Sequence, residues 1–327
     1  MKSSNFNFLM CSERSGSNFI TKLMNAHSKI CGPSVKHIIN PVTRNLFRYG
    51  NLNTPSNWKN LLSDINILMS VDFSIWKSQF TVDILEGLAQ PGDIPKLISE
   101  IFLREARAND KQNVFIKENH LYEFLPYLMI NFPESKFIYL YRDPRDMSLS
   151  WKKNPNHPAG IIKAARQWKL DQQQSLKNHF LLNQQGKSIS CSYENLTSNT
   201  ENTLKQILKF LGFEYEDKIL DFYKDKLTQN NAEKVGAWNN LARPIIKNNS
   251  NKFLSELTKV EISYIEKICY FEMKLLGYEP IHSKDELDSV KDADICKFAS
   301  YEESTIPYEP TEGVRLNMVA KANLYQR

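Results

Sequence analysis

The chain has 327 residues, of which 41% are hydrophobic and 24% are charged, as is usual for a globular protein with one large or two small domains. Its net charge of +5, from 42 basic and 37 acidic residues, includes no long basic run. This mild charge argues against extended nucleic-acid binding and suits a small anionic ligand.

The five cysteines are scattered and include no Cys-x-x-Cys pair, which argues against a disulfide framework or a zinc site. No cluster of carboxylates or histidines suggests another metal. The apolar run near the N-terminus is too short for a secretory signal, and we predict it to be a strand. No stretch approaches the ~20 apolar residues that a transmembrane helix needs. We therefore expect a cytoplasmic protein without a membrane span.

The segment 6–27 predicts a strand, a tight polar turn and a helix. An apolar run, 6–11, leads into Ser-Glu-Arg-Ser-Gly-Ser-Asn at 12–18, and apolar residues at helical spacing follow. Such a turn can cradle a phosphate on free backbone N–H groups, with Arg14 adding a permanent charge and Gly16 allowing close approach. An ordinary strand-to-helix turn is the alternative. The turn lacks the Gly-Lys-Ser/Thr of nucleoside-triphosphatases.

Residues 34–112 resemble a helical insertion before the next strand, with helices expected near 57–69 and 95–108. The aromatic residues in this region either pack the insertion onto the core or line an acceptor pocket; they are Trp58, Phe73, Trp76 and Phe80.

A second strand is expected at 114–117, followed by a helix with Asn119 as its N-cap. His120 would lie in the first turn, where the helix dipole favours a neutral imidazole that can accept a proton. A structural role for this histidine is the alternative.

The clearest predicted strand, 136–141, leads into another predicted helix, with Asp143 as its N-cap and Pro144 in its first turn. Arg142 at the strand end and Ser150 two turns into the helix can reach one anion. The alternative is a basic helix cap with a solvated face.

Further along, we expect helices near 158–182, 203–211, 217–226 and 256–276, and a strand at 188–191. The segment 231–238, which contains a cation, a glycine and a tryptophan, is predicted to be a loop. Beyond residue 282 the composition becomes acidic and polar, so 283–327 is expected to form a polar C-terminal tail or arm.

Two anion-binding turns within alternating strands and helices resemble the sulfotransferase family, which uses 3′-phosphoadenosine-5′-phosphosulfate (PAPS). The segment 12–18 is similar to that family's 5′-phosphosulfate loop, and 142–150 resembles its 3′-phosphate motif. Tyr193-Glu194-Asn195-Leu196 and the loop from Lys234 to Trp238 resemble two further elements. The resemblance covers residues 5–280 and implies a P-loop NTPase-like α/β fold, with a central parallel sheet flanked by helices, in a domain spanning 1–282.

The resemblance also implies roles for individual residues. The nucleotide would be bound by Arg14, Ser15, Gly16, Ser17, Asn18, Phe19, Arg142, Ser150, Tyr193, Lys234, Val235 and Gly236. Arg14 and Lys117 would stabilise the transferring group. Many members have Lys-Thr-x-His or Lys-Thr-His after the second strand, whereas this chain has Lys117-Glu118-Asn119-His120. The resemblance therefore leaves His120, Glu118 or an acid in the insertion as the catalytic base, with Glu13 as a further candidate.

The implied reaction transfers a sulfuryl group from PAPS, without a metal, to a hydroxyl or amine of a small molecule, carbohydrate or lipid. An ATP-dependent small-molecule kinase of related fold and a non-catalytic nucleotide-binding protein are the competing hypotheses. Dependence on magnesium separates the first from a sulfotransferase, and binding without turnover separates the second.

Overall fold

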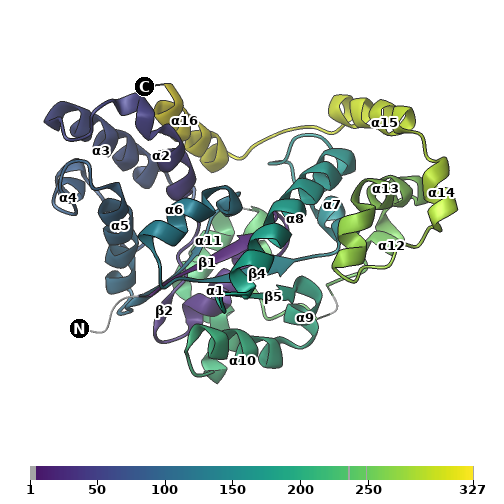
Figure 1. The fold of residues 1–327 in the computed structure, drawn as a ribbon, viewed down its shortest axis with the longest axis horizontal. Coiled ribbons are helices and arrows are strands. Elements are labelled where there is room, and N and C mark those ends of the chain that lie inside the picture. Colours follow the sequence, from purple (N-terminus) through teal and green to yellow (C-terminus); the bar gives the residue numbers. More distant parts are fainter. Residues whose placement is uncertain (1–4, 235, 248, 327) are drawn as a thin grey trace.

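The computed structural model describes residues 5–234, 236–247 and 249–326. Five parallel strands form a central sheet with helices on both faces (Figure 1). In the order β2-β3-β1-β4-β5, the strands are β2 (Ile30–Cys31), β3 (Asn113–Lys117), β1 (Phe6–Cys11), β4 (Lys136–Tyr141) and β5 (Ser188–Ser192). The predicted α/β fold with a central parallel sheet is confirmed.

The central strand β1 pairs with β3 on one side and β4 on the other, so Phe8 lies between Ile116 and Phe137. All three side chains are buried, as the apolar runs in these strands predict. Because the strands are parallel, their carboxyl ends meet at one edge of the sheet, where ligands bind in open α/β folds. The segments after β1, β3, β4 and β5 therefore gather there.

One face of the sheet is covered by helices of the predicted insertion and by those that follow β3. They are α2 (Ile39–Asn45), η1 (Leu46–Tyr49), α3 (Pro55–Ser70), α4 (Val82–Glu86), α5 (Ile94–Ala108), η2 (Leu121–Phe124) and α6 (Leu125–Asn131). Trp58, Trp76 and Phe80 are buried in the core cluster beneath them, so these aromatic side chains pack the insertion onto the sheet. Phe73 is not part of that cluster.

The opposite face of the sheet carries the first helix of the chain and helical segments that follow β5 in the sequence. They are α1 (Ser17–Ala26), α9 (Tyr193–Ser198), α10 (Thr200–Leu211) and η3 (Asp217–Lys224), which enclose a second cluster around Leu9 and Phe115. A third cluster lies between α7 (Pro144–Lys152), α8 (Ile161–Asn183), α12 (Phe253–Glu256) and α13 (Lys259–Leu275).

Several predicted elements differ in the structure. The predicted loop 231–238 instead contains the end of α11 (Lys226–Lys234) and the start of η4 (Gly236–Ala242). Here Asn231 is buried and binds the backbone of Ile75, a distant contact that local sequence does not show. The helix expected from 256 begins at Lys259, behind a Thr258 capping box, and α8 begins at Ile161 rather than at 158.

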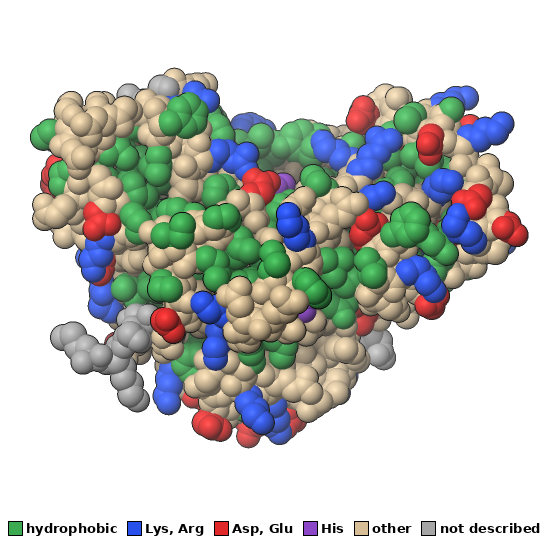
Figure 2. All heavy atoms as spheres, viewed as in Figure 1, with side chains coloured by type: hydrophobic (Ala, Val, Ile, Leu, Met, Phe, Trp, Pro, Cys, Tyr) green, Lys and Arg blue, Asp and Glu red, His purple; other side chains and the backbone are tan. Residues whose placement is uncertain are grey.

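The described part of the predicted tail or arm is largely helical: α14 (Lys284–Ser289), α15 (Asp292–Thr305) and α16 (Glu312–Gln326). After α15 the chain crosses the molecule, and α16 packs against α2 and α3 (Figure 1), with Ala320 and Leu324 buried in the first core cluster. In the space-filling view the surface is notched between α16 and α15 (Figure 2). None of the described helices is long and apolar enough to cross a membrane.

Candidate active site

The β1–α1 turn is bent by two residues in the left-handed region, Arg14 at φ 62° and Gly16 at φ 86°. This conformation is free of strain for glycine but costs a residue such as arginine on the order of 1 kcal/mol. A Cβ at Gly16 would lie only 2.4 Å from Cδ2 of Tyr193, so the close approach requires glycine. Since α1 begins at Ser17, the first backbone N–H groups of this helix lie at the turn and have no acceptor within the helix.

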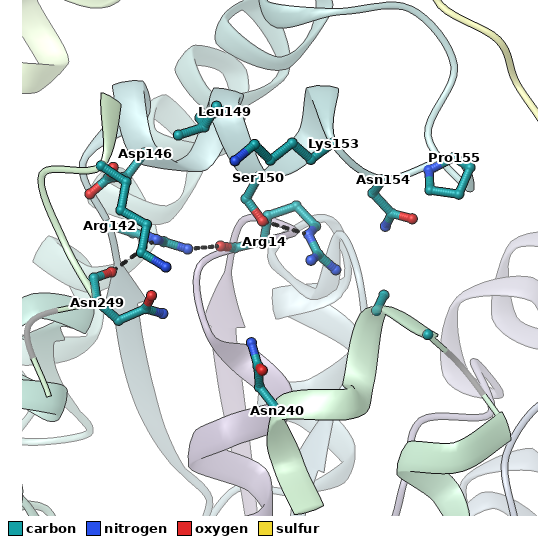
Figure 3. A pocket seen from close by; sticks show the side chains of 13 residues that line it. Arg14, Arg142, Asp146, Leu149, Ser150, Lys153, Asn154, Pro155, Asn240 and Asn249 are labelled. Atoms are coloured by element: carbon teal, nitrogen blue, oxygen red, sulfur yellow. Dashed lines mark hydrogen bonds between the residues drawn. The ribbon is translucent and has the colours of Figure 1, made fainter. Parts of the chain in front are cut away.

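Arg14 and Arg142 bring together the two segments that were predicted to bind anions. The Nε of Arg14 donates to Oγ of Ser150 at 3.1 Å, and Nη1 of Arg142 donates to the carbonyl of Arg14 at 3.0 Å (Figure 3). The guanidinium of Arg142 also lies 4.3 Å from the ring centroid of Tyr193. Residues far apart in the sequence thus form one cationic site at the sheet edge.

These residues border a cavity of about 380 Å³, which we call the Arg142 cavity. It is lined by Arg14, Arg142, Asp146, Leu149, Ser150, Lys153, Asn154, Pro155, Gly236, Ala237, Asn240, Asn249 and Lys252 (Figure 3). Four of these side chains are cationic and one is a carboxylate. The cavity therefore suits an anion.

Two buried polar atoms near this cavity have no hydrogen-bond partner among the described residues: Nε of Arg142 and Oγ of Ser15. Buried donors of this kind are nearly always bonded in native proteins, so a ligand with acceptor oxygens is the natural partner. This observation fits a phosphorylated nucleotide at the site.

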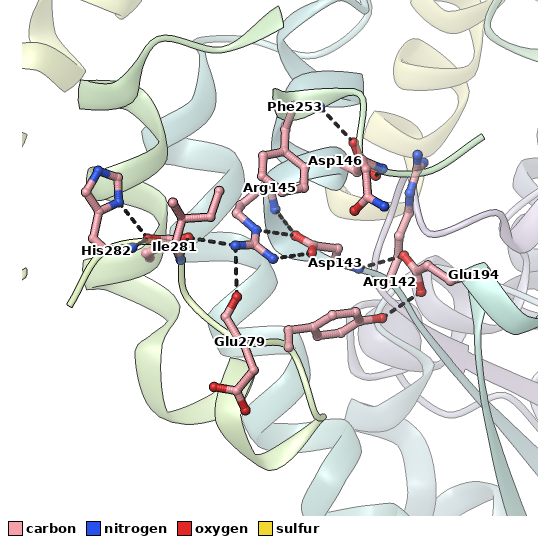
Figure 4. A network of polar contacts seen from close by, with 12 residues as sticks. Arg142, Asp143, Arg145, Asp146, Glu194, Phe253, Glu279, Ile281 and His282 are labelled. Atoms are coloured by element: carbon pink, nitrogen blue, oxygen red, sulfur yellow. Dashed lines mark hydrogen bonds and ion pairs between the residues drawn. The ribbon is translucent and has the colours of Figure 1, made fainter. Parts of the chain in front are cut away.

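A buried network fixes the backbone around Arg142 (Figure 4). The carboxylate of Asp143 caps α7 at the N–H of Arg145 and also binds the Arg145 guanidinium at 2.6 and 3.0 Å. Arg145 in turn binds Glu266 of α13 at 2.6 Å, and Glu266 binds His282 at 2.8 Å. A buried bidentate pair of this kind holds its partners in a fixed geometry, so it ties the Arg142 segment to α13.

A second cavity of about 380 Å³, the His37 cavity, lies on the other side of Arg14. Arg14, Asn154 and Ala237 line both cavities, so the two adjoin. The His37 cavity has an apolar wall formed by Val35, Phe73, Trp238, Val314 and Met318.

Of the two histidines that line the His37 cavity, His157 is already bonded at both ring nitrogens. Its Nδ1 accepts from the side-chain amide of Asn154 at 2.9 Å, and its Nε2 donates to Glu13 at 2.6 Å. Burial tends to raise the pKa of Glu13, but its bond to His157 and the nearby positive charges lower it to about 2. Glu13 is therefore ionised, and His157 has no free nitrogen.

His37 is different, because it makes no hydrogen bond or ion pair within the described part of the chain. Burial, together with the charges of Lys321 and Lys117, holds its pKa well below the usual range. Its backbone lies in the left-handed region at φ 56°, and its ring faces that of Phe73. A neutral, unbonded imidazole in a cavity is suited to accept a proton.

The predicted residues after β3 lie in three environments. Lys117 lines the His37 cavity, and its Nζ donates to the side chain of Asn119 at 2.6 Å. The carboxylate of Glu118 accepts the backbone N–H groups of Ile38, Ile39 and Asn40 at 2.5–2.9 Å, so it anchors the start of α2.

His120 is the residue before the 3₁₀ turn η2, and it is not in the first turn of a helix as predicted. Asn119 does not cap that turn, since its side chain binds Lys117 and Glu13 instead. The Nδ1 of His120 lies 3.3 Å from Glu123 and 3.4 Å from the hydroxyl of Tyr122, and His120 does not line the two cavities.

The remaining predicted residues are only partly brought together. Ser17 and Asn18 line the His37 cavity, and Gly236 lines the Arg142 cavity, whereas Phe19 packs against Phe222. Lys234 pairs with Asp72 at the surface. Val235 lies outside the described residues.

Sequence reasoning missed His37, His157 and Lys321. His37 follows β2, a two-residue strand too short to give a periodic signal, although the carboxyl end of any strand in such a sheet is a candidate site. Lys321 belongs to the segment predicted as a tail. Nowhere in the described chain are three or more His, Cys, Asp or Glu side chains grouped so that they could hold a metal ion.

Comparison with known proteins agrees with this geometry. The sulfotransferase family model matches residues 8–217, more than half of the chain, and the chain therefore belongs to the sulfotransferase family. Its fold is accordingly the P-loop-like α/β fold of that family.

Two solved structures are similar in fold. The sulfotransferase domain of the olefin synthase from Synechococcus PCC 7002 has a TM-score of 0.54 and 18% identity, covering 83% of this chain and 96% of that domain. The sulfotransferase domain from the curacin biosynthetic pathway has a TM-score of 0.54 and 16% identity, covering 85% and 98%.

An uncharacterised protein of Aquifex aeolicus is 21% identical over 231 residues. That alignment covers 67% of this chain but only 27% of the relative, so the chain spans about a quarter of its length.

Proposed function

We propose that the protein transfers a sulfuryl group from PAPS, bound in the Arg142 cavity, to a hydroxyl or amine of an acceptor in the His37 cavity. The observation that carries this proposal is the junction of the two cavities at Arg14. A group transferred in line between two bound molecules must pass such a junction.

The Arg142 cavity offers separate partners for the two ends of the nucleotide. Arg142 and Ser150 would hold the 3′-phosphate, with Lys153 and Lys252 adding positive charge. The 5′ end would lie against the β1–α1 turn, whose N–H groups and helix dipole favour an anion. The unpartnered Ser15 hydroxyl is available there.

When bound, PAPS supplies the sulfuryl group, whose bond to the phosphate oxygen breaks as the bond to the acceptor forms. The electron pair remains on that phosphate oxygen, so donors directed at it lower the barrier. Arg14 lines both cavities and Lys117 lines the His37 cavity, so these two cations are our candidates for that role. Removing one such donor typically costs about 3 kcal/mol, or roughly a hundredfold in rate.

We assign the base to His37, because it lines the His37 cavity as a neutral imidazole with no competing bond. Its ring would take the proton that the attacking oxygen or nitrogen loses. Glu118 is a poorer candidate because three backbone donors occupy its carboxylate. His120 remains the alternative from the sequence.

A thermal-shift comparison tests the donor. Adenosine 3′,5′-bisphosphate at a hundred times its dissociation constant stabilises the native state by about 2.7 kcal/mol, which is several degrees for a chain of this size. ATP and ADP with magnesium should give little shift at equal concentration. A shift with ATP and magnesium alone would overturn the proposal in favour of a kinase.

A further inference from the structure

The C-terminal arm builds part of the wall of the His37 cavity. Val314, Asn317, Met318 and Lys321 of α16 line the cavity, as does Tyr308 in the connector before that helix. None of these residues lines the Arg142 cavity. They are therefore placed to meet an acceptor and not the nucleotide.

The arm is bonded to the rest of the cavity wall. In the connector, the N–H of Glu309 donates to the carbonyl of Pro155 at 3.0 Å, and the N–H of Thr311 donates to the side chain of Asn156 at 2.8 Å. The other face of α16 is buried through Ala320 and Leu324. The position of Lys321 is thus fixed by packing on both sides of it.

The charge of the His37 cavity is unbalanced. Arg14, Lys117, Lys163 and Lys321 line it, whereas its one carboxylate, Glu13, is already bonded to His157 and Asn119. Lys and Arg side chains also lie along the notch seen in Figure 2.

Lys321 has no hydrogen bond or ion pair among the residues that the structure describes, although it is half-buried. Burial lowers its pKa to about 8, which leaves it largely protonated at neutral pH. The charges of Glu118 and Glu13 partly offset this burial, but other donors already occupy both carboxylates, and neither of them bonds directly to Lys321. A half-buried cation without a bonded partner is costly, and an anionic ligand lowers that cost.

We propose, on the basis of the proposed function, that the acceptor is an amphipathic hydroxy or amino acid whose anionic group binds Lys321. Its apolar body lies against Phe73, Trp238 and Met318, and its hydroxyl or amine faces His37 and Arg14. The volume of about 380 Å³ suits a small molecule of this kind.

The test is a calorimetric titration into protein saturated with adenosine 3′,5′-bisphosphate, with two matched pairs as probes. The pairs are 8-hydroxyoctanoate with its methyl ester, and 4-hydroxyphenylacetate with its methyl ester. For at least one pair we expect the acid to bind about tenfold to a hundredfold more tightly than the ester, as a charge-assisted bond provides.

Lys321→Met keeps the length of the side chain and removes its charge, so it should abolish the preference for the acid and leave binding of the ester unchanged. Lys321→Arg should retain the preference. Arg315→Met is the matched control, because Arg315 lies on the same helix, is exposed and pairs with Glu312. It should behave like the wild type.

Acids that bind no more tightly than their esters, or a preference that survives in Lys321→Met, would overturn the inference while the proposed function stands. Failure of the bisphosphate itself to bind in the first step would overturn the proposed function and this inference with it.

Discussion

The two cavities adjoin at Arg14, yet the chain builds them in different ways. The Arg142 cavity forms chiefly from segments that directly follow β1 and β4, and the buried network around Arg145 fixes it from behind. The His37 cavity shares the β1–α1 turn and takes Lys117 and Asn119 from the end of β3, but it is completed by the segment after β2, the residues around His157, η4 and α16. The first cavity is set mostly by local geometry at strand ends, whereas the second depends more on packing between distant parts of the chain.

Under the proposed function, this difference would separate recognition of the donor from recognition of the acceptor. Substitutions around Arg142 should change nucleotide affinity, whereas those around His37 should change turnover or acceptor binding. The predictions below test that separation.

The largest effect is expected at His37. Replacing a general base lowers turnover by about a hundredfold to ten-thousandfold, so His37→Gln should do so while leaving the affinity for adenosine 3′,5′-bisphosphate unchanged. Steady-state kinetics with the tightest-binding acceptor, together with titration of the bisphosphate, measures both quantities.

His120→Gln is the matched control and should cost less than tenfold. In the wild type, turnover should hold as the pH falls through 6.5 and decline only well below it, because His37 stays neutral there. A large loss in His120→Gln with none in His37→Gln would assign the base to His120.

The buried network predicts a large effect on stability. The side chains of Arg145 and Glu266 are only 6% and 0% exposed, so Glu266→Ala removes one of the two carboxylates that bind the buried Arg145 guanidinium and also removes the acceptor for His282. The free energy of unfolding should fall by about 3–5 kcal/mol in urea denaturation.

For comparison, Glu201→Ala breaks an exposed pair with Lys205 and should cost less than about 1 kcal/mol. Equal losses in the two variants would show that the network does not anchor the Arg142 segment.

Arg142→Ala should raise the dissociation constant of adenosine 3′,5′-bisphosphate by about tenfold to a hundredfold, with a smaller effect on turnover. Adenosine 5′-phosphate, which lacks the 3′-phosphate, should bind the variant and the wild type alike. Weakening of both ligands to the same degree would contradict the assignment of Arg142 to the 3′-phosphate.

The smallest effect is a change of stability with pH at Glu13. Its folded-state pKa of about 2 lies below the ordinary 4.5, so its contribution is complete above pH 4.5 and is lost as the pH falls toward 2. The difference in unfolding free energy between wild type and Glu13→Gln should shrink over that range. A difference that stays constant would exclude the pair with His157 as its source.

The sequence predicts the surroundings of the Arg142 cavity well because its signals are local. Apolar runs mark β1, β3 and β4, and the Asp143-Pro144 pair predicts the cap of α7 that the structure contains. Parallel strands place their carboxyl ends at one edge of the sheet, and this brings Arg14, Arg142 and Ser150 close together.

The His37 cavity could not be predicted in the same way. His37 and Lys321 line one cavity although 283 positions separate them in the sequence, and no periodic pattern encodes that contact. The predicted loop at 231–238 was wrong for a related reason, since its helix is stabilised by the distant backbone of Ile75.

The most direct test follows the transferred group itself. Parallel reactions with PAPS labelled in its sulfuryl group and with ATP labelled in its γ-phosphate, each with the hydroxy acids above, show which donor loses its label to the acceptor. We predict transfer from PAPS alone, with about a hundredfold lower rate in Arg14→Ala. Transfer from ATP, with none from PAPS, would contradict the account.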